Sequence, residues 1–114
     1  LPEDGPARVV FVHLEQGRNL HAVSRKGLSN PYCVLEVAEQ EQLGNFENIT
    51  MAAKQSHTVR KTTNPVWRED FTFTVRCPKI ARLRIHVCHL YKFLGFKVRT
   101  ETLGIAVVPL SEML

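Results

Sequence analysis

The stretch KTTNPVWREDFTFTV, residues 61–75, combines a turn signal with a regular alternation of apolar and polar side chains. Asn64-Pro65 favours a turn, because proline fixes φ and asparagine bonds to its own backbone. Phe71, Phe73 and Val75 then recur at every second position, with polar residues between them. Because successive side chains of a strand point to opposite faces, this spacing predicts a strand with one buried and one exposed face.

Other stretches are also strand-like, and polar, glycine-bearing segments separate them. They are VVFVHLE (9–15), YCVLEVA (32–38), RLRIHVCHL (82–90) and LGIAVVPL (103–110), and KQSHTVRKTT (54–63) reads as an amphipathic or edge strand. Residues 39–53 show no strong element, residues 89–99 read as a loop, and only SEML (111–114) suggests a helical turn. Short strands at this spacing favour an all-β fold, an antiparallel β-sandwich of about seven or eight strands.

A chain of 114 residues, 44% hydrophobic and 23% charged, has the length and composition of one globular domain. Residues 1–8 are polar and carry proline and glycine, so we expect a linker or leader there and the domain over residues 9–114. The chain begins without methionine, and we expect it to be part of a larger protein. No apolar run approaches the ~20 residues that span a bilayer.

The net charge of +4 and the pI near 9.2 favour an acidic partner: nucleic acid, anionic lipid or an acidic protein. No nucleic-acid recognition motif is present, so we do not expect nucleic-acid binding. Cys33, Cys77 and Cys88 lack the spacing of a metal site, and Cys33 and Cys88 lie in apolar runs. Reduced thiols of this kind indicate a cytoplasmic protein.

Scaffold residues along most of the chain carry a family resemblance. They are Gly17-Arg18-Asn19-Leu20, Gly27 to Tyr32 (GLSNPY), Lys61 to Trp67 (KTTNPVW), Glu69, Phe71 to Phe73 (FTF), Leu103-Gly104 and Val108 to Ser111 (VPLS). In this order and spacing, the sequence resembles a C2 domain, which implies a sandwich of the C2 type. Trp67 is expected to anchor the core. We read these residues as scaffold.

The resemblance also implies a Ca²⁺ site, built from aspartates on loops at one end of the sandwich. The matching positions here hold Ser24, Asn30, His89, Tyr91 and Glu101. Ca²⁺ takes about six to eight oxygen ligands, and one carboxylate with one amide cannot supply them. We therefore expect a calcium-independent member that binds no metal.

Where the Ca²⁺ loops are expected, this sequence carries cations and large apolar residues instead. The candidate membrane-docking residues are Arg25, Lys26, Lys92, Phe93, Leu94, Phe96, Lys97 and Arg99. Lysines and arginines attract anionic lipid, and the apolar residues can insert between headgroups. The alternative is that the apolar residues fold back as a small loop core or pack on a neighbouring domain.

The resemblance implies a second lipid site, a basic face of the sheet. Its candidates here are Tyr32, Lys54, His57, Arg60, Arg82 and Arg84, although an ordinary solvated face explains them too. The histidines lack zinc spacing, and no catalytic set has supporting context, so we expect no enzyme activity and no cofactor. We expect a peripheral membrane module of a signalling or trafficking protein that docks on anionic phospholipid. The alternative is a protein or interdomain interaction module without lipid binding.

Overall fold

The computed structural model describes residues 7–21, 29–40, 48–93 and 96–113. In these segments the strands are β1 (Arg8–Gln16), β2 (Pro31–Gln40), β3 (Asn48–Gln55), β4 (Val66–Val75), β5 (Ala81–Phe93) and β6 (Phe96–Pro109). A short 3-10 helix, η2 (Leu110–Met113), follows β6 directly. The predicted all-β class is confirmed, and no helix of the described segments is long and apolar enough to cross a membrane.

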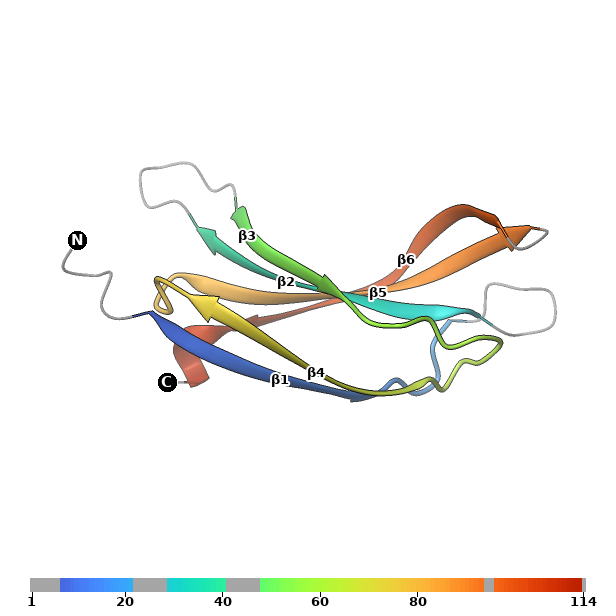
Figure 1. Ribbon diagram of the computed structural model, residues 1–114, viewed down its shortest axis with the longest axis horizontal. Coiled ribbons are helices and arrows are strands. Elements are labelled where there is room, and N and C mark those ends of the chain that lie inside the picture. The colour runs from blue at the N-terminus through green and yellow to red at the C-terminus, as the bar shows by residue number, and fades with distance from the viewer. Residues whose placement is uncertain (1–6, 22–28, 41–47, 94–95, 114) are drawn as a thin grey trace.

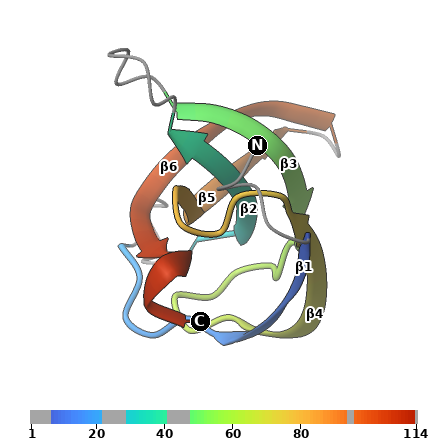
Figure 2. The same ribbon diagram turned by 90° about the vertical axis from the view of Figure 1, so that its left-hand side faces the viewer.

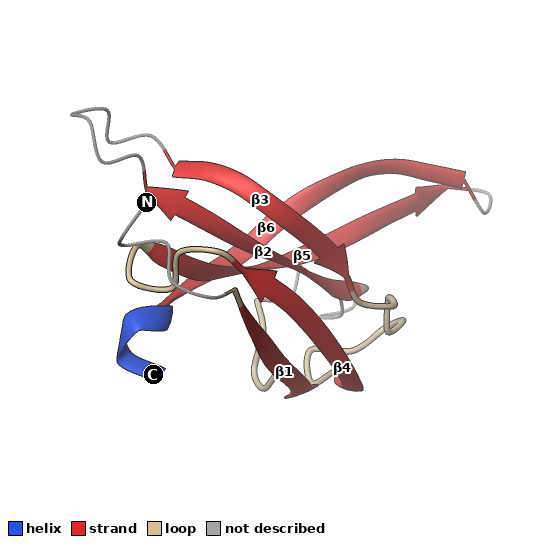
Figure 3. Cartoon of the chain, turned by 60° about the vertical axis from the view of Figure 1, so that its left-hand side comes forward, coloured by secondary structure: helices blue, strands red, loops and turns tan. Residues whose placement is uncertain are grey.

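The strands form two antiparallel sheets that face each other (Figure 1, Figure 3). The larger sheet has the order β3-β2-β5-β6, and the smaller sheet pairs β1 with β4. Figure 2 looks along the long axis and shows β1 and β4 on the side opposite the larger sheet. The predicted antiparallel sandwich is therefore confirmed, with six strands in the described part of the chain.

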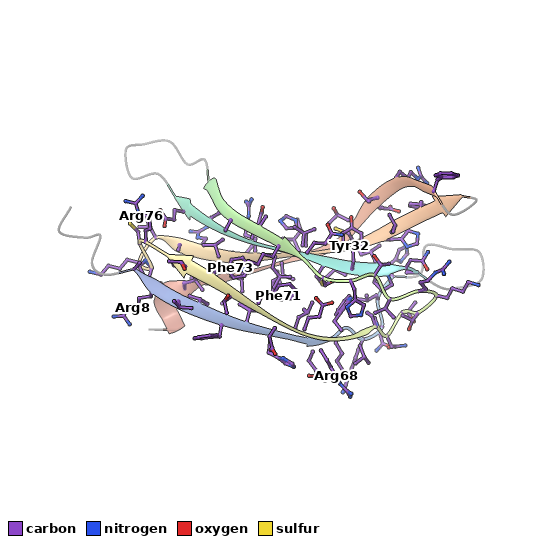
Figure 4. All side chains as sticks on the ribbon, viewed as in Figure 1. Arg8, Tyr32, Arg68, Phe71, Phe73 and Arg76 are labelled. Carbon is purple, nitrogen blue, oxygen red and sulfur yellow. The ribbon has the colours of Figure 1, made fainter. Side chains whose placement is uncertain are left out.

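The alternation predicted for residues 69–75 is realised in β4. Phe71, Phe73 and Val75 are buried, while the threonines between them are exposed. Figure 4 shows Phe71 and Phe73 between the two sheets. The core also contains Cys33, Leu35 and Val37 of β2, Trp67 of β4, Ala81 and Leu83 of β5 and Leu110 of η2. Burying an aromatic or aliphatic side chain of this size contributes roughly 1.5–3 kcal/mol, so these side chains hold the sheets together.

The predicted Asn64-Pro65 turn brings the chain back to the end of β1. The carbonyl of Pro65 accepts the backbone N–H of Gly17 at 2.9 Å, and Oδ1 of Asn64 accepts that of Asn19 at 2.9 Å. A Cβ at Gly17 would stand 3.3 Å from Cγ of Pro65, a closer approach than most side chains tolerate. Glycine at position 17 thus permits the close contact between this turn and β1.

Two sequence predictions for residues 39–63 are wrong. The sequence indicates no strong element over residues 39–53, yet β3 begins at Asn48. It predicts a strand over residues 54–63, yet β3 ends at Gln55 and residues 56–65 form a loop. Ala53, Lys54 and Gln55 are exposed on this edge strand, so no apolar alternation marks it.

The prediction of a loop over residues 89–99 is also wrong in the described part. β5 continues to Phe93 and β6 starts at Phe96. β2 makes its last pair with β5 at Pro31–His89, so beyond His89 the strand β5 pairs only with β6. Residues 90–93 and 96–100 thus form a two-stranded ribbon that extends past the larger sheet, and we call this ribbon the arm (Figure 1).

Candidate functional site

Three segments meet at Asn30, near the point where the arm leaves the larger sheet. The backbone N–H of Asn30 donates to Nδ1 of His89 at 2.9 Å, and its side-chain amide donates to the carbonyl of Leu90 at 3.2 Å. Oδ1 of Asn30 accepts the backbone N–H of Lys61 at 2.9 Å. Asn30 therefore joins the start of β2, loop 56–65 and the arm. We call the end of the molecule that these three parts form the hairpin end.

Loop 56–65 is fixed against the start of β2 along most of its length. Backbone N–H groups donate from Ser56 to Cys33 at 2.9 Å, from Val59 to Pro31 at 3.0 Å and from Thr62 to Ser29 at 2.8 Å. The hydroxyl of Ser56 also accepts the backbone N–H of Cys33 at 2.8 Å. These bonds give the loop a defined shape, in which Arg60 and Lys61 are exposed.

His89 is a neutral, buried side chain at the hairpin end. It is 3% exposed, and its Nδ1 accepts a backbone N–H, so the ring proton belongs on Nε2. Burial lowers the pKa of His89; the carboxylate of Glu101 opposes this shift, and the guanidinium of Arg99 adds to it. The imidazole thus replaces the expected aspartate with an uncharged group that is already bonded to the backbone.

Tyr91 connects His89 with two charged residues of β6. Its ring stands edge-on to the His89 ring, with centroids 4.3 Å apart and an interplanar angle of 82°. Its hydroxyl donates to Oε2 of Glu101 at 2.8 Å, and this bond raises the pKa of Tyr91. The guanidinium carbon of Arg99 lies 4.1 Å from the centroid of the Tyr91 ring, within the range of a cation–π contact.

The described residues at this end do not fit a Ca²⁺ site. Oδ1 of Asn30 accepts the N–H of Lys61, His89 offers nitrogen rather than oxygen, and Glu101 accepts from Tyr91. Ca²⁺ needs about six to eight oxygens. Within the described ranges no group of three or more His, Cys, Asp or Glu side chains could hold a metal ion. Ser24, the remaining expected position, lies outside those ranges.

The predicted docking residues fall mainly on the arm. Phe96 stands at the tip with 75% of its surface exposed, and Arg99 is exposed further along β6. Backbone pairing sets Phe93 opposite Phe96 and Lys92 opposite Lys97. The side chains of Lys92, Phe93 and Lys97, and all of Arg25, Lys26 and Leu94, lie outside the described part of the chain.

The candidate basic face of the larger sheet is partly neutralised. Nε of Arg84 donates to Oε1 of Glu36 at 2.7 Å, and Nε2 of His86 bonds to the same oxygen at 2.8 Å. Burial acts to raise the pKa of Glu36, but these two hydrogen bonds prevail and the pKa is lowered. Arg82, at the start of β5, is exposed.

The remaining candidates for that face lie in different places. Tyr32 is 6% exposed, and burial raises its pKa. Nζ of Lys54 donates to the carbonyl of Thr72 on β4 and lies over the ring of Phe73. His57 bonds to Glu69, and both His57 and Arg60 belong to loop 56–65 rather than to a strand. The six candidates thus come from β2, β3, β5 and loop 56–65.

Sequence reasoning missed two features. Lys61 lies at the hairpin end because Asn30 binds its backbone, and nothing in the composition of KTTNP marks that long-range contact. Ile105 and Val107 are 60% and 49% exposed on β6, and the apolar run LGIAVV gives no sign of an exposed face. Apolar content alone does not reveal that β6 is an edge strand of the larger sheet.

Comparisons with known proteins support the family resemblance seen in the sequence. A family model for the C2 domain matches residues 8–114. Protein C2-DOMAIN ABA-RELATED 10 of Arabidopsis thaliana is 31% identical over 90 residues, which cover 79% of this chain and 42% of that protein. The 1-phosphatidylinositol 4,5-bisphosphate phosphodiesterase gamma plc-3 of Caenorhabditis elegans is 30% identical over 73 residues, which cover 62% of this chain and 5% of that protein. This chain thus spans less than half the length of either relative.

Solved structures share the fold. A C2 domain of plant Extended Synaptotagmin 1 has a TM-score of 0.71 at 24% identity, over 91% of this chain and 70% of that chain. A C2 domain of RIM from Drosophila has a TM-score of 0.68 at 18% identity, over 90% of this chain and 75% of that chain. A structure of Extended-Synaptotagmin 2 that joins an SMP domain to two C2 domains has a TM-score of 0.66 at 28% identity, over 94% of this chain and 20% of that chain.

Proposed function

The chain belongs to the C2 domain family, and from this premise we propose that it docks on anionic phospholipid membrane without Ca²⁺, through the hairpin end. It acts there as a non-catalytic targeting module of a larger cytoplasmic signalling or trafficking protein. One relative is named as a phosphodiesterase of a phosphoinositide, which agrees with work at a membrane surface.

The observation that carries this proposal is the arm itself. Phe96 is 75% exposed at the tip of a ribbon that extends past the sandwich, and Arg99 is exposed on the same strand. Groups at the expected Ca²⁺ positions are engaged with each other instead, as in the Tyr91–Glu101 bond. Fixed cations and an exposed aromatic ring can attract and enter an anionic bilayer with no ion to complete the surface.

The energies suit reversible docking. Each lysine or arginine near an anionic surface contributes about 1 kcal/mol. Complete burial of a phenylalanine contributes roughly 1.5–3 kcal/mol, and insertion of Phe96 into the headgroup region contributes less. A few such contacts, less the cost of ordering them, give weak binding that the rest of a larger protein can strengthen by multivalency.

Sedimentation with phosphatidylserine-containing vesicles in chelator tests the proposal. We expect the wild-type chain to bind, Phe96→Ala to bind several-fold more weakly, and added Ca²⁺ to change neither result. Phe11→Ala is the matched control, because Phe11 is a phenylalanine 77% exposed on β1, in the other sheet. No binding of the wild-type chain in chelator, or equal losses in Phe96→Ala and Phe11→Ala, would contradict the proposal.

A protein-interaction role is the second candidate, and exposed Ile105 and Val107 on the edge strand β6 favour it. Exposed apolar residues on an edge strand are typical of protein contacts. If the chain has this role, Ile105→Thr/Val107→Thr abolishes retention of a partner protein and Phe96→Ala does not. The wild-type chain then does not bind phosphatidylserine-containing vesicles. Vesicle binding that is unchanged in the double threonine variant argues for the lipid role instead.

A further inference from the structure

The middle of β6 carries exposed apolar side chains at an edge of the larger sheet. Within the described segments β6 pairs with β5 alone (Figure 2). Residues 104–107 are all exposed, and Ile105 and Val107 keep 60% and 49% of their surface in solvent. The sequence has no charged residue over positions 102–109. Because charged side chains are a common protection of sheet edges, this stretch can accept a further strand.

The surroundings of the two apolar side chains show what kind of strand would fit. Ile105 and Val107 pair with His86 and Arg84 of β5 and therefore lie on the same face of the sheet as these two residues. Arg84 and His86 both bond to Oε1 of Glu36, at 2.7 and 2.8 Å. The polar groups beside the apolar pair are thus bonded to one another, and an uncharged, apolar strand complements this edge better than a charged one.

The regular part of the edge has defined limits. A bulge in the pairing of β5 with β6 leaves Leu103 without a partner residue on β5 and precedes the stretch. Pro109, which has no backbone N–H, follows it. Residues 104–108 remain as a regular segment of about the usual strand length, with Ala106 at its centre.

We propose that β6 pairs antiparallel with β6 of a second copy of this chain, across a two-fold axis at Ala106. This register sets Ile105 opposite Val107 of the partner subunit, and the symmetry repeats the contact on the other side of the axis. A shift by one residue would place the apolar side chains of the two copies on opposite faces of the joined sheet. The pairing needs no membrane, so it does not depend on the docking function proposed above.

A second copy is the fitting occupant because the edge is complementary to itself. Isoleucine and valine are β-branched and pack well as cross-strand neighbours. Ala106, the residue that meets its own copy at the axis, has a small side chain, and no like charges oppose each other along residues 102–109. The pairing occupies this edge in both copies, so association stops at two chains.

Sedimentation velocity over a series of protein concentrations, without lipid, tests the pairing. We expect the mass to rise from that of one chain, 13.0 kDa, to twice that value and no further. Val107→Lys should weaken self-association at least about tenfold, because it sets an unpaired ammonium group against Ile105 of the partner subunit. Val9→Lys is the matched control: Val9 is 55% exposed on β1, in the other sheet, and this variant should associate as the wild type does.

A mixture of two variants tests the register. Ile105→Lys and Val107→Glu should each self-associate at least about tenfold more weakly than wild type. Mixing them should restore association, because the mixed dimer contains one lysine–glutamate pair and one intact valine–isoleucine pair. Circular dichroism spectra check that each variant is folded, and Ile105→Thr/Val107→Thr, which keeps β-branched residues at both positions, replaces any variant that is not.

The pairing is overturned by a wild-type chain that stays monomeric at every concentration, or that assembles beyond two copies. Equal losses in Val107→Lys and Val9→Lys would overturn it as well, and so would a mixture of the two complementary variants that stays monomeric. Phe96→Ala should form the dimer as the wild type does. A failure of the docking function therefore leaves the pairing standing, and a failure of the pairing leaves the docking function standing.

Discussion

His89 shows how one side chain can make the hairpin end sensitive to acid. Its Nδ1 accepts the Asn30 N–H only while the ring is neutral, and burial lowers its pKa below the usual 6.5. A group with a lowered pKa contributes stability that is complete above its unfolded pKa and is lost as pH falls through the folded value. We therefore expect the free energy of unfolding to decrease as the pH is lowered from about 6.5. Urea titrations between pH 5 and pH 8 would measure this decrease.

His89→Asn isolates that effect, because Oδ1 of asparagine can accept the same N–H and does not titrate. The difference in unfolding free energy between wild type and His89→Asn should shrink or reverse as pH falls below 6.5. His13 acts in the opposite sense, because hydrogen bonds to Glu15 and Asp70 raise its pKa. Its contribution to the free energy of unfolding is present below pH 6.5 and is lost as the pH rises through its folded-state pKa. If the curves of unfolding free energy against pH are parallel for wild type and His89→Asn, the pKa of His89 does not differ between the folded and unfolded states.

The cysteines differ in reactivity because they differ in burial. Cys33 is 1% exposed, and burial raises the pKa of its thiol to about 12; burial also raises the pKa of Cys88. Since the thiolate is the reactive form, both should resist alkylation in the native state, whereas half-buried Cys77 should react first. Native-state labelling at pH 8 followed by mass spectrometry checks this. Fast labelling of Cys33 would mean that the sandwich opens.

At the scale of the strand, β4 supplies Trp67, Phe71, Phe73 and Val75 to the core. Phe73 is 2% exposed between the sheets, so Phe73→Ala should cost about 3–5 kcal/mol of unfolding free energy. Thr74, the next residue, faces solvent, and Thr74→Ala should cost less than about 1 kcal/mol. Chemical denaturation measures both. Similar losses at the two positions would mean that the observed register of β4 is wrong.

Strands whose apolar side chains alternate into the core could be predicted from the sequence, and the arm and the edge strand β3 could not. β4 alternates because Phe71 and Phe73 face the core while Thr72 and Thr74 face water. The arm has no core beneath it, because β2 stops pairing at His89. Alternation of apolar and polar residues indicates that one face of a strand is buried, and a strand can form without it. The sequence of the arm and of the edge strand β3 therefore shows no clear alternation.

The residue types of the candidate site could be predicted, but the contacts between those residues could not. The resemblance to a C2 domain assigns Ser24, Asn30, His89, Tyr91 and Glu101 to the expected Ca²⁺ positions, and their side-chain chemistry makes them a poor set of ligands. It does not show that Asn30 binds Lys61 and Leu90, since these contacts span 31 and 60 residues. Glu36 could not be identified in advance as the partner of Arg84, because their pairing depends on the register between β2 and β5.

The molecule as a whole is elongated and carries cations at both ends of its long axis. It extends 54 Å along that axis, with the arm at one end and Arg8 and Arg76 at the other (Figure 4). The screening length is only about 10 Å at 0.1 M salt. A bilayer in contact with the arm therefore interacts with the nearby cations and hardly at all with the far ones. The net charge of +4 is a sum over the whole chain, so it does not describe the charge that a bilayer meets at the arm.

Salt dependence follows from this arrangement. If fixed cations supply most of the attraction, raising NaCl from about 0.05 M to 0.5 M should weaken binding to phosphatidylserine vesicles at least tenfold in chelator, because screening shortens to a few ångströms. Arg60→Glu/Lys61→Glu should show a shallower salt dependence than wild type, whereas Phe96→Ala should keep the wild-type slope at lower affinity. Flotation or sedimentation across a salt series gives both slopes. Binding that is insensitive to salt but rises with Ca²⁺ would mean that an ion, and not the fixed charges of the hairpin end, brings the domain to the membrane.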